Sequence, residues 1–507
     1  MTARLRALSP QRLRGMRRGI EKESLRADAA GRLALTPHPA TLGSALTHPR
    51  ITTDFSESQL EFITGVHDSA EACVAEMRDI HRFVVPEIGD ELLWVASMPC
   101  RLPIDETIPL GRYGSSNVGR MKSVYRMGLG YRYGRRMQTI SGIHYNWSLP
   151  GLGDDDYFAL IRNFRRHSFL LLLLFGASPA VCSNFVEGRP HELQTIGDDS
   201  LYLPYATSLR MGRLGYQSEA QASIAASFNN LESYGRSLEQ ALMQPYPPYA
   251  AIGVRNPGGE YNQLSTSLLQ IENEFYGTIR PKRTIRPGER PLHALRERGV
   301  EYIEVRCMDL DPFEPIGIGA ETMRFLDVFL LHALLADSAP DSPAEIAALA
   351  RNQHRTAAQG RMPGLKLERD GGEVLLIDWA HEIVAGCAAL ARQLDEALGG
   401  RAYQAAVDAA GARLRDLDST PSARALRAMS ADFGGSFPAF ARACSAATRE
   451  RFLAEPLAAA GRERFIAMAA ESVAAQRAIE AADRLPFEDY RLEYLSVERL
   501  QVERAAA

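Results

Sequence analysis

The stretch GIEKESLR, residues 19–26, places two carboxylates, Glu21 and Glu23, two positions apart next to the apolar Ile20. On a β-strand alternate side chains point to the same face, so the two carboxylates would lie side by side and repel each other. On a helix they would be separated by about 200° and would barely meet. If the stretch is a strand, we therefore expect a cation on its acidic face. A solvated strand edge or the first turn of a helix would instead hold both acids without a cation.

Length and composition indicate a soluble globular protein. The 507 residues suffice for one large core or for about two or three ordinary domains, and 46% of them are hydrophobic. The formal net charge of -4 gives no overall attraction to nucleic acid or to an anionic membrane. The Arg-rich N-terminus lacks the apolar segment of a secretory signal, and the run FLLLLLF, residues 169–175, is too short to span a bilayer.

Six cysteines are scattered singly, without a CxxC pair. This spacing argues against a zinc knuckle and against a dense disulfide framework. It predicts a protein of the reducing cytoplasm.

Alternating apolar and polar residues predict five strands, over residues 19–26, 59–64, 140–149, 265–276 and 300–309. Helical patterns lie between them, at 69–85 and 154–175. Since the strands keep one polar face, we expect an α+β fold with a mainly antiparallel sheet. An apolar helix over 323–337 precedes an Ala-, Arg- and Glu-rich helical region, so we divide the chain into a catalytic region, 1–337, and a helical region, 338–507, packed on the same domain.

The polar faces of these strands carry acids and one imidazole. In QLEFIT, Glu61 lies between Leu60 and Phe62, and a carboxylate buried there needs a partner, which a plain salt bridge could supply. In SGIHYNWSLP, His144 heads a polar row, although a single histidine is more often structural. Two further polar rows comprise Tyr302, Glu304 and Arg306, and Gln270, Glu272, Glu274 and Tyr276.

Together, several strands that present acids from one face would form a pocket for several cations. Oxygen ligands with one histidine suit Mg²⁺ or Mn²⁺ better than zinc. Clustered hard cations on a sheet usually accompany nucleoside triphosphate chemistry.

A basic run, residues 119–138, contains six Lys or Arg residues with tyrosines between them. It could bind nucleic acid, bind small anions, or form a solvated helix face. The net charge and the acidic strand faces argue against nucleic acid. The glycines lack Walker A or Rossmann spacing, and no GxSxG motif is present.

Six motifs in this order resemble the proteobacterial-type glutamate–cysteine ligase family, over about residues 15–335. They are GIEKESLR, ITTDFSESQLEFITG, MQTISGIHYNWSLP, LYLPYATSLRMGRLGYQ, LQIENEFYGTIRPKR and YIEVRCMDLDPF. The resemblance implies a glutamine-synthetase-like catalytic fold, in which a curved sheet forms a funnel with helices outside. It implies a cytoplasmic, monomeric enzyme that makes γ-glutamylcysteine from L-glutamate, L-cysteine and ATP through γ-glutamyl phosphate, with two or three Mg²⁺ or Mn²⁺ ions and without nucleic acid or membrane partners.

The resemblance also implies roles for individual residues. The implied metal ligands, not assigned to individual ions, are Glu21, Glu23, Asp54, Glu61, His144 and Glu304. Arg306 would clamp the transferred phosphoryl group and act with Glu304 in catalysis. The implied substrate-binding residues are Arg126, Gln138, Ile140, Arg210, Tyr216 and Tyr276, the two tyrosines for cysteine, and the implied nucleotide-binding residues are Lys282 and Arg283. A related carboxylate–amine ligase with another acceptor amine would share the metal and phosphate residues and differ around Tyr216 and Tyr276.

Overall fold

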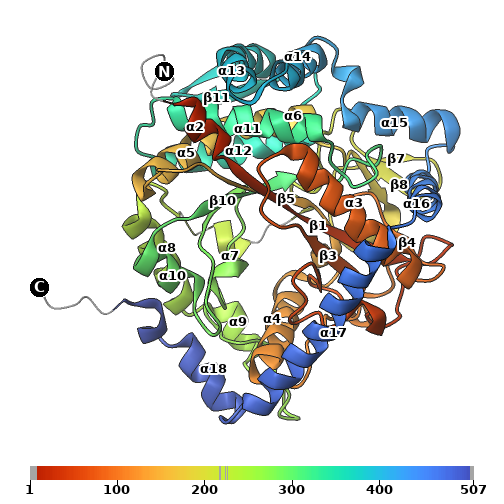
Figure 1. Cartoon of the computed structure of the whole chain (residues 1–507), viewed down its shortest axis with the longest axis vertical. Coiled ribbons are helices and arrows are strands. Elements are labelled where there is room, and N and C mark those ends of the chain that lie inside the picture. The colour runs from red at the N-terminus through yellow and green to blue at the C-terminus, as the bar shows by residue number, and fades with distance from the viewer. Residues whose placement is uncertain (1–7, 216–218, 223, 225, 503–507) are drawn as a thin grey trace, which may run out of the picture.

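The computed structural model describes residues 8–215, 219–222, 224 and 226–502 (Figure 1). Its main sheet has the strand order β2-β3-β1-β5-β10-β9, with β4 paired to β1, and these strands pair antiparallel throughout. These strands are β1 (Arg17–Ala27), β2 (Ile51–Thr53), β3 (Gln59–Ile63), β4 (Leu92–Leu93), β5 (Ile143–Ser148), β9 (Ile279–Lys282) and β10 (Tyr302–Met308). The smaller sheets join β6 (Ala180–Cys182), β7 (Gln194–Ile196) and β8 (Ser200–Tyr202), and β11 (Lys366–Arg369) and β12 (Gly372–Leu375). The predicted antiparallel α+β fold is confirmed.

Helices surround the sheet. In the first two-thirds of the chain they are α2 (Pro10–Arg14), α3 (Ala70–Glu87), α4 (Asn117–Tyr133), α5 (Asp154–His167), α6 (Phe169–Phe175), α7 (Glu219–Ala222), α8 (Leu231–Met243), α9 (Pro247–Ile252), α10 (Pro291–Arg298) and α11 (Ala320–Leu335). The later ones are α12 (Pro343–Gln359), α13 (Leu376–Leu398), α14 (Ala402–Arg415), α15 (Pro421–Asp432), α16 (Phe437–Ala454), α17 (Ala459–Ala482) and α18 (Phe487–Leu495). The apolar face of the sheet packs against α3, α5 and α6, and α11, α13 and α14 extend this layer (Figure 1).

Strand alternation decides which residues enter the core. Ile143, Tyr145 and Trp147 on β5 are all buried among the apolar side chains of the main core, while His144 and Asn146 face the other way. β9 accommodates Pro281, which has no backbone N–H to donate, because β9 is an edge strand and one side of it needs no ladder hydrogen bonds.

The predicted strand at 265–276 is wrong. The segment is irregular and contains only a short 3-10 helix, η5 (Glu272–Glu274). Glu272 is held by Arg290 at 2.7 Å, and Glu274 bonds Arg132 at 3.0 Å and the Tyr133 hydroxyl at 2.6 Å. These acids alternate in sequence because each meets its own partner, and not because they share a strand face.

The later helices share the main core with the sheet. Leu390 and Leu394 of α13 belong to the same buried cluster as Ile20 and Ile303. This packing supports treating 338–507 as part of one domain, while the division at residue 337 stays a prediction. None of the helices in the described part of the chain combines the length and hydropathy needed to cross a membrane.

A buried ionic network ties the back of the sheet to two helices. The guanidinium of Arg18 on β1 lies 2.9 Å from the carboxylate of Asp327 on α11, and neither side chain is exposed. The hydroxyls of Tyr145 on β5 and Tyr403 on α14 also donate to Asp327, at 2.6 and 3.3 Å. Burying this pair is costly unless its geometry and hydrogen bonds compensate, and here they fix the sheet against both helices.

Candidate active site

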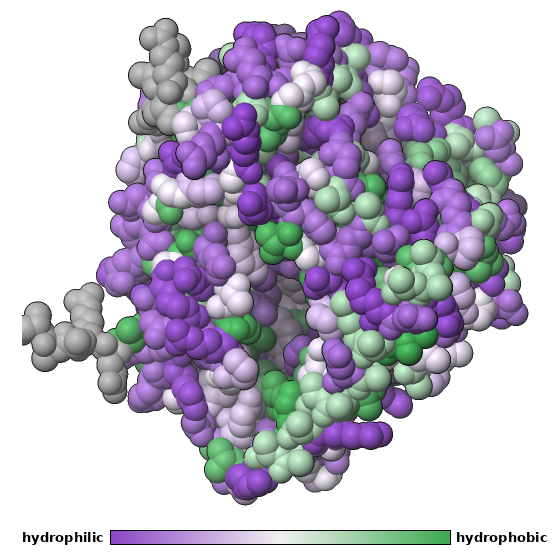
Figure 2. All heavy atoms as spheres, viewed as in Figure 1, coloured by the Kyte–Doolittle hydropathy of each residue, from purple (hydrophilic) through white to green (hydrophobic). Residues whose placement is uncertain are grey.

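A cavity of about 890 Å³ lies against the polar face of the sheet. Figure 2 shows the hollow at the centre of this side of the molecule. Its walls come from the sheet, from α4, α12 and α18, and from the irregular segment around η5. Twelve of the residues singled out in the sequence line it: Glu21, Glu23, Asp54, Glu61, Arg126, Gln138, His144, Arg210, Tyr276, Lys282, Glu304 and Arg306.

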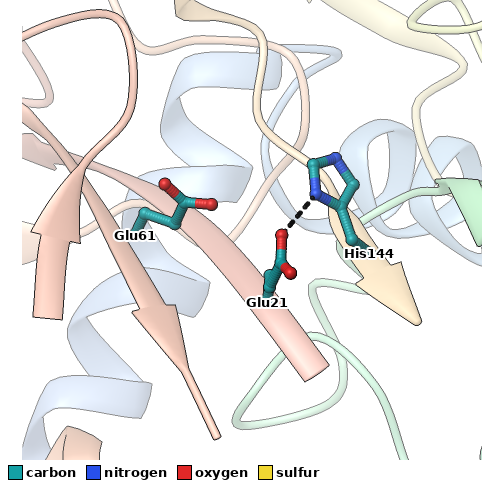
Figure 3. Close-up of side chains that lie close together, drawn as sticks. All are labelled: Glu21, Glu61 and His144. Carbon is teal, nitrogen blue, oxygen red and sulfur yellow. Dashed lines mark hydrogen bonds and ion pairs between the residues drawn. The ribbon is translucent and has the colours of Figure 1, made fainter. Parts of the chain in front are cut away.

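Three of these residues lie close enough to share one metal ion. Glu21, Glu61 and His144 each offer a ligand atom within 4.8 Å of the others (Figure 3). Strand register produces this arrangement, because Glu21 on β1 lies opposite His144 on β5, and Glu23 lies opposite Glu61 on β3. The Nδ1 atom of His144 is 3.1 Å from Oε2 of Glu21, and Asn146 donates to the other oxygen at 2.9 Å.

Glu304, on β10, is the carboxylate with the most cationic surroundings. Arg306 donates to one oxygen at 2.7 Å, Lys282 donates to the other at 3.1 Å, and His144 lies 3.8 Å away. Burial opposes ionisation, but Lys282, Arg306 and His144 hold the pKa of Glu304 well below its usual value. This carboxylate is therefore ionised at neutral pH.

The pKa values of Glu23 and Glu61 are raised, in contrast to that of Glu304. Burial and the charge of Asp54 raise the pKa of Glu23 to about 8. Burial, Asp54 and the two glutamates of β1 raise the pKa of Glu61 well above its usual value. Like charges opposite each other on neighbouring strands are destabilising, so this end of the cavity favours either a proton or a cation.

Arg210 is placed by contacts on both sides. It donates to the carbonyl oxygen of Arg306 at 2.9 Å and lies 3.9 Å from the buried carboxylate of Asp309. Its guanidinium packs against Gly142, where a Cβ atom would collide with it. The amide of Gly142 also donates to Glu23 at 2.8 Å, so a residue without a side chain lets the arginine and the acid approach together.

The basic run folds mainly into α4, and one stripe of this helix faces the cavity. The stripe consists of Val118, Met121, Lys122, Tyr125, Arg126 and Leu129, spaced by three or four residues. Arg126 donates to the carbonyl oxygen of Asp54, and its guanidinium lies 4.5 Å from the ring centre of Tyr113. The helical spacing in the sequence is sufficient to indicate this stripe. The arginines and tyrosines taken by themselves indicate only a charged segment.

The aromatic part of the cavity is centred on Tyr276. Its hydroxyl accepts a hydrogen bond from Nε2 of Gln138 at 3.0 Å, and its ring meets that of Tyr133 edge to face at 5.8 Å. Tyr490 and Tyr494 of α18 also line the cavity. Sequence analysis missed them, because nothing in the C-terminal third indicates which helix returns to the sheet.

Two proposed site residues, Ile140 and Arg283, are absent from the lining of this cavity. Ile140 is fully buried beside it, and its carbonyl oxygen accepts from Gln59 at 3.3 Å. Arg283 turns to the carbonyl oxygen of Arg298 at 2.7 Å and to Glu301. Tyr216 lies outside the described residues. Their roles stay predictions.

An antiparallel sheet whose polar face lines a cavity with carboxylates and guanidinium groups is consistent with the glutamine-synthetase-like fold. A model of the family described as glutamate-cysteine ligase matches residues 4–356. The chain belongs to the glutamate–cysteine ligase family, whose reaction joins glutamate to cysteine as γ-glutamylcysteine, the first step of glutathione synthesis.

Similar proteins support this assignment along the whole chain. The glutamate–cysteine ligase of Azotobacter vinelandii is 49% identical over 503 residues, which cover 95% of this chain and 94% of the relative. The one from Janthinobacterium is 49% identical over 492 residues, with 94% and 93% covered. A crystal structure of the glutamate–cysteine ligase of Francisella tularensis in complex with AMP has a TM-score of 0.90 and 38% identity, and covers 95% of this chain and 97% of that chain.

Proposed function

We propose that the cavity couples ATP hydrolysis to the joining of L-glutamate and L-cysteine in two steps. The γ-carboxylate of glutamate attacks the γ-phosphorus of ATP, which gives γ-glutamyl phosphate and ADP. The amine of cysteine then attacks the acyl carbon and expels phosphate. The observation that supports this most directly is the juxtaposition of buried acids with Arg306 and Lys282 in one cavity, since anionic reactants need both counter-charges and metal ligands. The AMP bound to the Francisella enzyme supports nucleotide binding.

The donor set fits two or three Mg²⁺ or Mn²⁺ ions. Carboxylate oxygens with one imidazole suit these hard cations, and burial together with neighbouring acids raises the pKa values of Glu23 and Glu61, which a bound cation would lower. The residues that would hold the ions are Glu21, Glu23, Asp54, Glu61, His144 and Glu304. When bound, the ions would neutralise the phosphate oxygens and orient them for transfer.

Arg306 is proposed to clamp the transferred phosphoryl group. Its planar guanidinium suits phosphoryl oxygens, and its bond to Glu304 aims it into the cavity. Arg126 and Arg210 would hold the glutamate and phosphate region, while Lys282, at the β9 edge, would contact the nucleotide. No contact in the cavity supports the roles predicted for Arg283 and Ile140, and these roles stay predictions. The role of Tyr216, which lies outside the described residues, also stays a prediction.

Tyr276 and Gln138 are proposed to bound the cysteine pocket. Their mutual hydrogen bond makes a wall that is both aromatic and polar, which suits a small, uncharged side chain. The acyl phosphate is hydrolysable, so the pocket must exclude water during the second step. A carboxylate of the acid cluster would accept the proton of the attacking amine.

The experiment is to measure ADP release by the purified protein with ATP, glutamate and Mg²⁺, with and without cysteine. Cysteine-dependent ADP release and formation of γ-glutamylcysteine are expected. Glu304→Gln should abolish both while the circular dichroism spectrum stays unchanged, because it removes the proposed metal ligand. Equal turnover of this variant at saturating Mg²⁺ would contradict the metal assignment.

A further inference from the structure

Seven cationic side chains line the cavity among the described residues. Six of them have a hydrogen bond or an ion pair through the charged group: Arg126, Arg165, Arg210, Arg280, Lys282 and Arg306. The seventh, Lys122, has no described carboxylate within 4 Å of its ammonium nitrogen and donates no described hydrogen bond. A partly buried ammonium without such a partner indicates an anionic ligand that binds there.

The ammonium group of Lys122 is held in place on one side. It lies 5.1 Å from the ring centre of Tyr113, and the guanidinium of Arg126, one helical turn later, lies 4.5 Å from the same ring. The Tyr113 hydroxyl donates to the carbonyl oxygens of Thr53 and Asp54, both at 2.8 Å, so the ring is a fixed platform. Lys122 therefore faces the cavity with an ammonium group that can bind an anion, while the ring of Tyr113 restrains its side chain.

Lys122 lies far from Lys282, the proposed nucleotide contact, along the sheet. It lies at the β2–β3 end of the sheet, beside Tyr113, which bonds to the last residues of β2. Lys282, the proposed nucleotide contact, is on β9, four strand steps from β3. Adjacent strands are about 4.8 Å apart, so β3 and β9 are separated by roughly 19 Å along the sheet.

We propose that Lys122 binds the unreacting α-carboxylate of an amino-acid substrate, an inference that rests on the proposed function of the cavity. Glutamate and cysteine both carry an α-carboxylate that takes no part in bond formation, and each must be oriented. Burial and Arg126 lower the pKa of Lys122 to about 8, whereas Glu61 and Asp54 act in the opposite direction. A bound carboxylate would add to their effect and hold the lysine charged.

The test compares Lys122→Met and Lys122→Arg with the wild type by steady-state kinetics in glutamate, cysteine and ATP. Arg236→Met is the control, because Arg236 is an exposed cation on α8 that does not line the cavity. We expect Lys122→Met to raise KM for one amino acid by about 10- to 100-fold, with kcat and KM for ATP nearly unchanged. Lys122→Arg should restore part of the loss because it keeps the charge.

Cysteamine, which is cysteine without its carboxylate, shows whether Lys122 binds the α-carboxylate of cysteine or that of glutamate. If Lys122 binds cysteine, the wild type prefers cysteine over cysteamine and Lys122→Met loses most of that preference. If it binds glutamate, KM for glutamate rises and the preference is kept. The inference is overturned if neither amino-acid KM changes, or if only KM for ATP rises; Lys122→Gln provides the same comparison if the methionine variant does not fold. An inactive wild type would contradict the proposed function itself.

Discussion

At the scale of single residues, the cavity contains carboxylates of two kinds. Glu304 is surrounded by cations and stays ionised, whereas Glu23 and Glu61 face each other and other acids and favour a proton. Because the folded-state pKa of Glu23, about 8, lies above its ordinary value of 4.5, its proton stabilises the fold at low pH, and that contribution is lost as the pH rises through about 8.

Metal binding should therefore release protons near pH 7. Mg²⁺ would replace the protons of Glu23 and Glu61, since metal ligands must be deprotonated. The measurement is calorimetric titration with Mg²⁺ in two buffers of different ionisation enthalpy. Proton release should be smaller in Glu61→Gln, and the part that comes from Glu23 should decline as the pH rises through about 8. A binding enthalpy independent of the buffer at pH 7 would contradict this prediction.

Arg306→Lys should reduce kcat by about 100-fold or more, because lysine keeps the charge but loses the planar fork that we propose holds the phosphoryl group. The wild-type guanidinium is fixed by Glu304 at 2.7 Å, so the loss is one of geometry. Single-turnover ADP formation measures the effect. An increase confined to KM for glutamate would instead place Arg306 in substrate binding.

Tyr276→Ala should raise KM for cysteine at least about 10-fold while KM for ATP changes little, because the substitution opens the pocket wall held by Gln138. The wild type should accept 2-aminobutyrate, in which a methyl group replaces the thiol, and should use glycine and leucine poorly. Product formation with these four amines is the measurement. Preference for ammonia or for a charged amine would favour a ligase with another acceptor.

At the scale of elements, the alternation of apolar residues predicted the buried faces of strands better than the alternation of charged residues did. Ile143, Tyr145 and Trp147 could be assigned to the core because a strand with one buried face has a strict period of two. The segment 265–276 shows the same alternation without a strand, since Glu272 and Glu274 are neutralised by arginines that are distant in sequence or on another element. Alternation alone cannot separate these cases.

The site was predictable where long motifs carry it, on β1, β3, β5 and β10. It was not predictable where a helix from elsewhere completes the wall. Tyr490 and Tyr494 reach the cavity only because α18 docks on α4, with Phe487 packed beneath the guanidinium of Arg120 at 4.5 Å. Such docking depends on tertiary packing, which leaves no short-range signal in the sequence.

Truncation after Pro486 should therefore lower kcat/KM by about 10-fold or more, because it removes both tyrosines and opens the cavity. Truncation after Val502, which keeps α18, is the matched control and should retain activity. Steady-state kinetics and thermal melting of both proteins test this. Equal activity of the two truncated chains would show that α18 is dispensable for turnover.

At the scale of the whole molecule, the Arg18–Asp327 pair joins the sheet to the outer helices. Asp327→Asn should lower the free energy of unfolding by about 3–5 kcal/mol, because it leaves a buried guanidinium without its counter-ion. Glu232→Gln is the control: it breaks the exposed pair with Arg236 and should cost no more than about 1 kcal/mol. Urea denaturation measures both, and equal midpoints would contradict the prediction.

Sequence could predict the general architecture of the molecule but not this link between its parts. Arg18 reads as one of several N-terminal arginines, and Asp327 as a single acid in an apolar helix. Their pairing, and the contact with Tyr403, depend on folding across more than three hundred residues. The predicted monomeric state stays a prediction.

The order of the strands in the sheet has a consequence for biosynthesis. β1 is made first but occupies the middle of the sheet, where it pairs with β3 on one side and with β5 on the other, so its second side stays unpaired until β5 leaves the ribosome. At about 5–20 residues per second, synthesis from Arg18 to Tyr403, which completes the network around Asp327, takes roughly 20 to 80 s. During this interval the main core lacks α14, so part of its apolar surface is exposed to other nascent chains. The protein should therefore depend on chaperones and give more native product when translation and aggregation are slowed together by cooling.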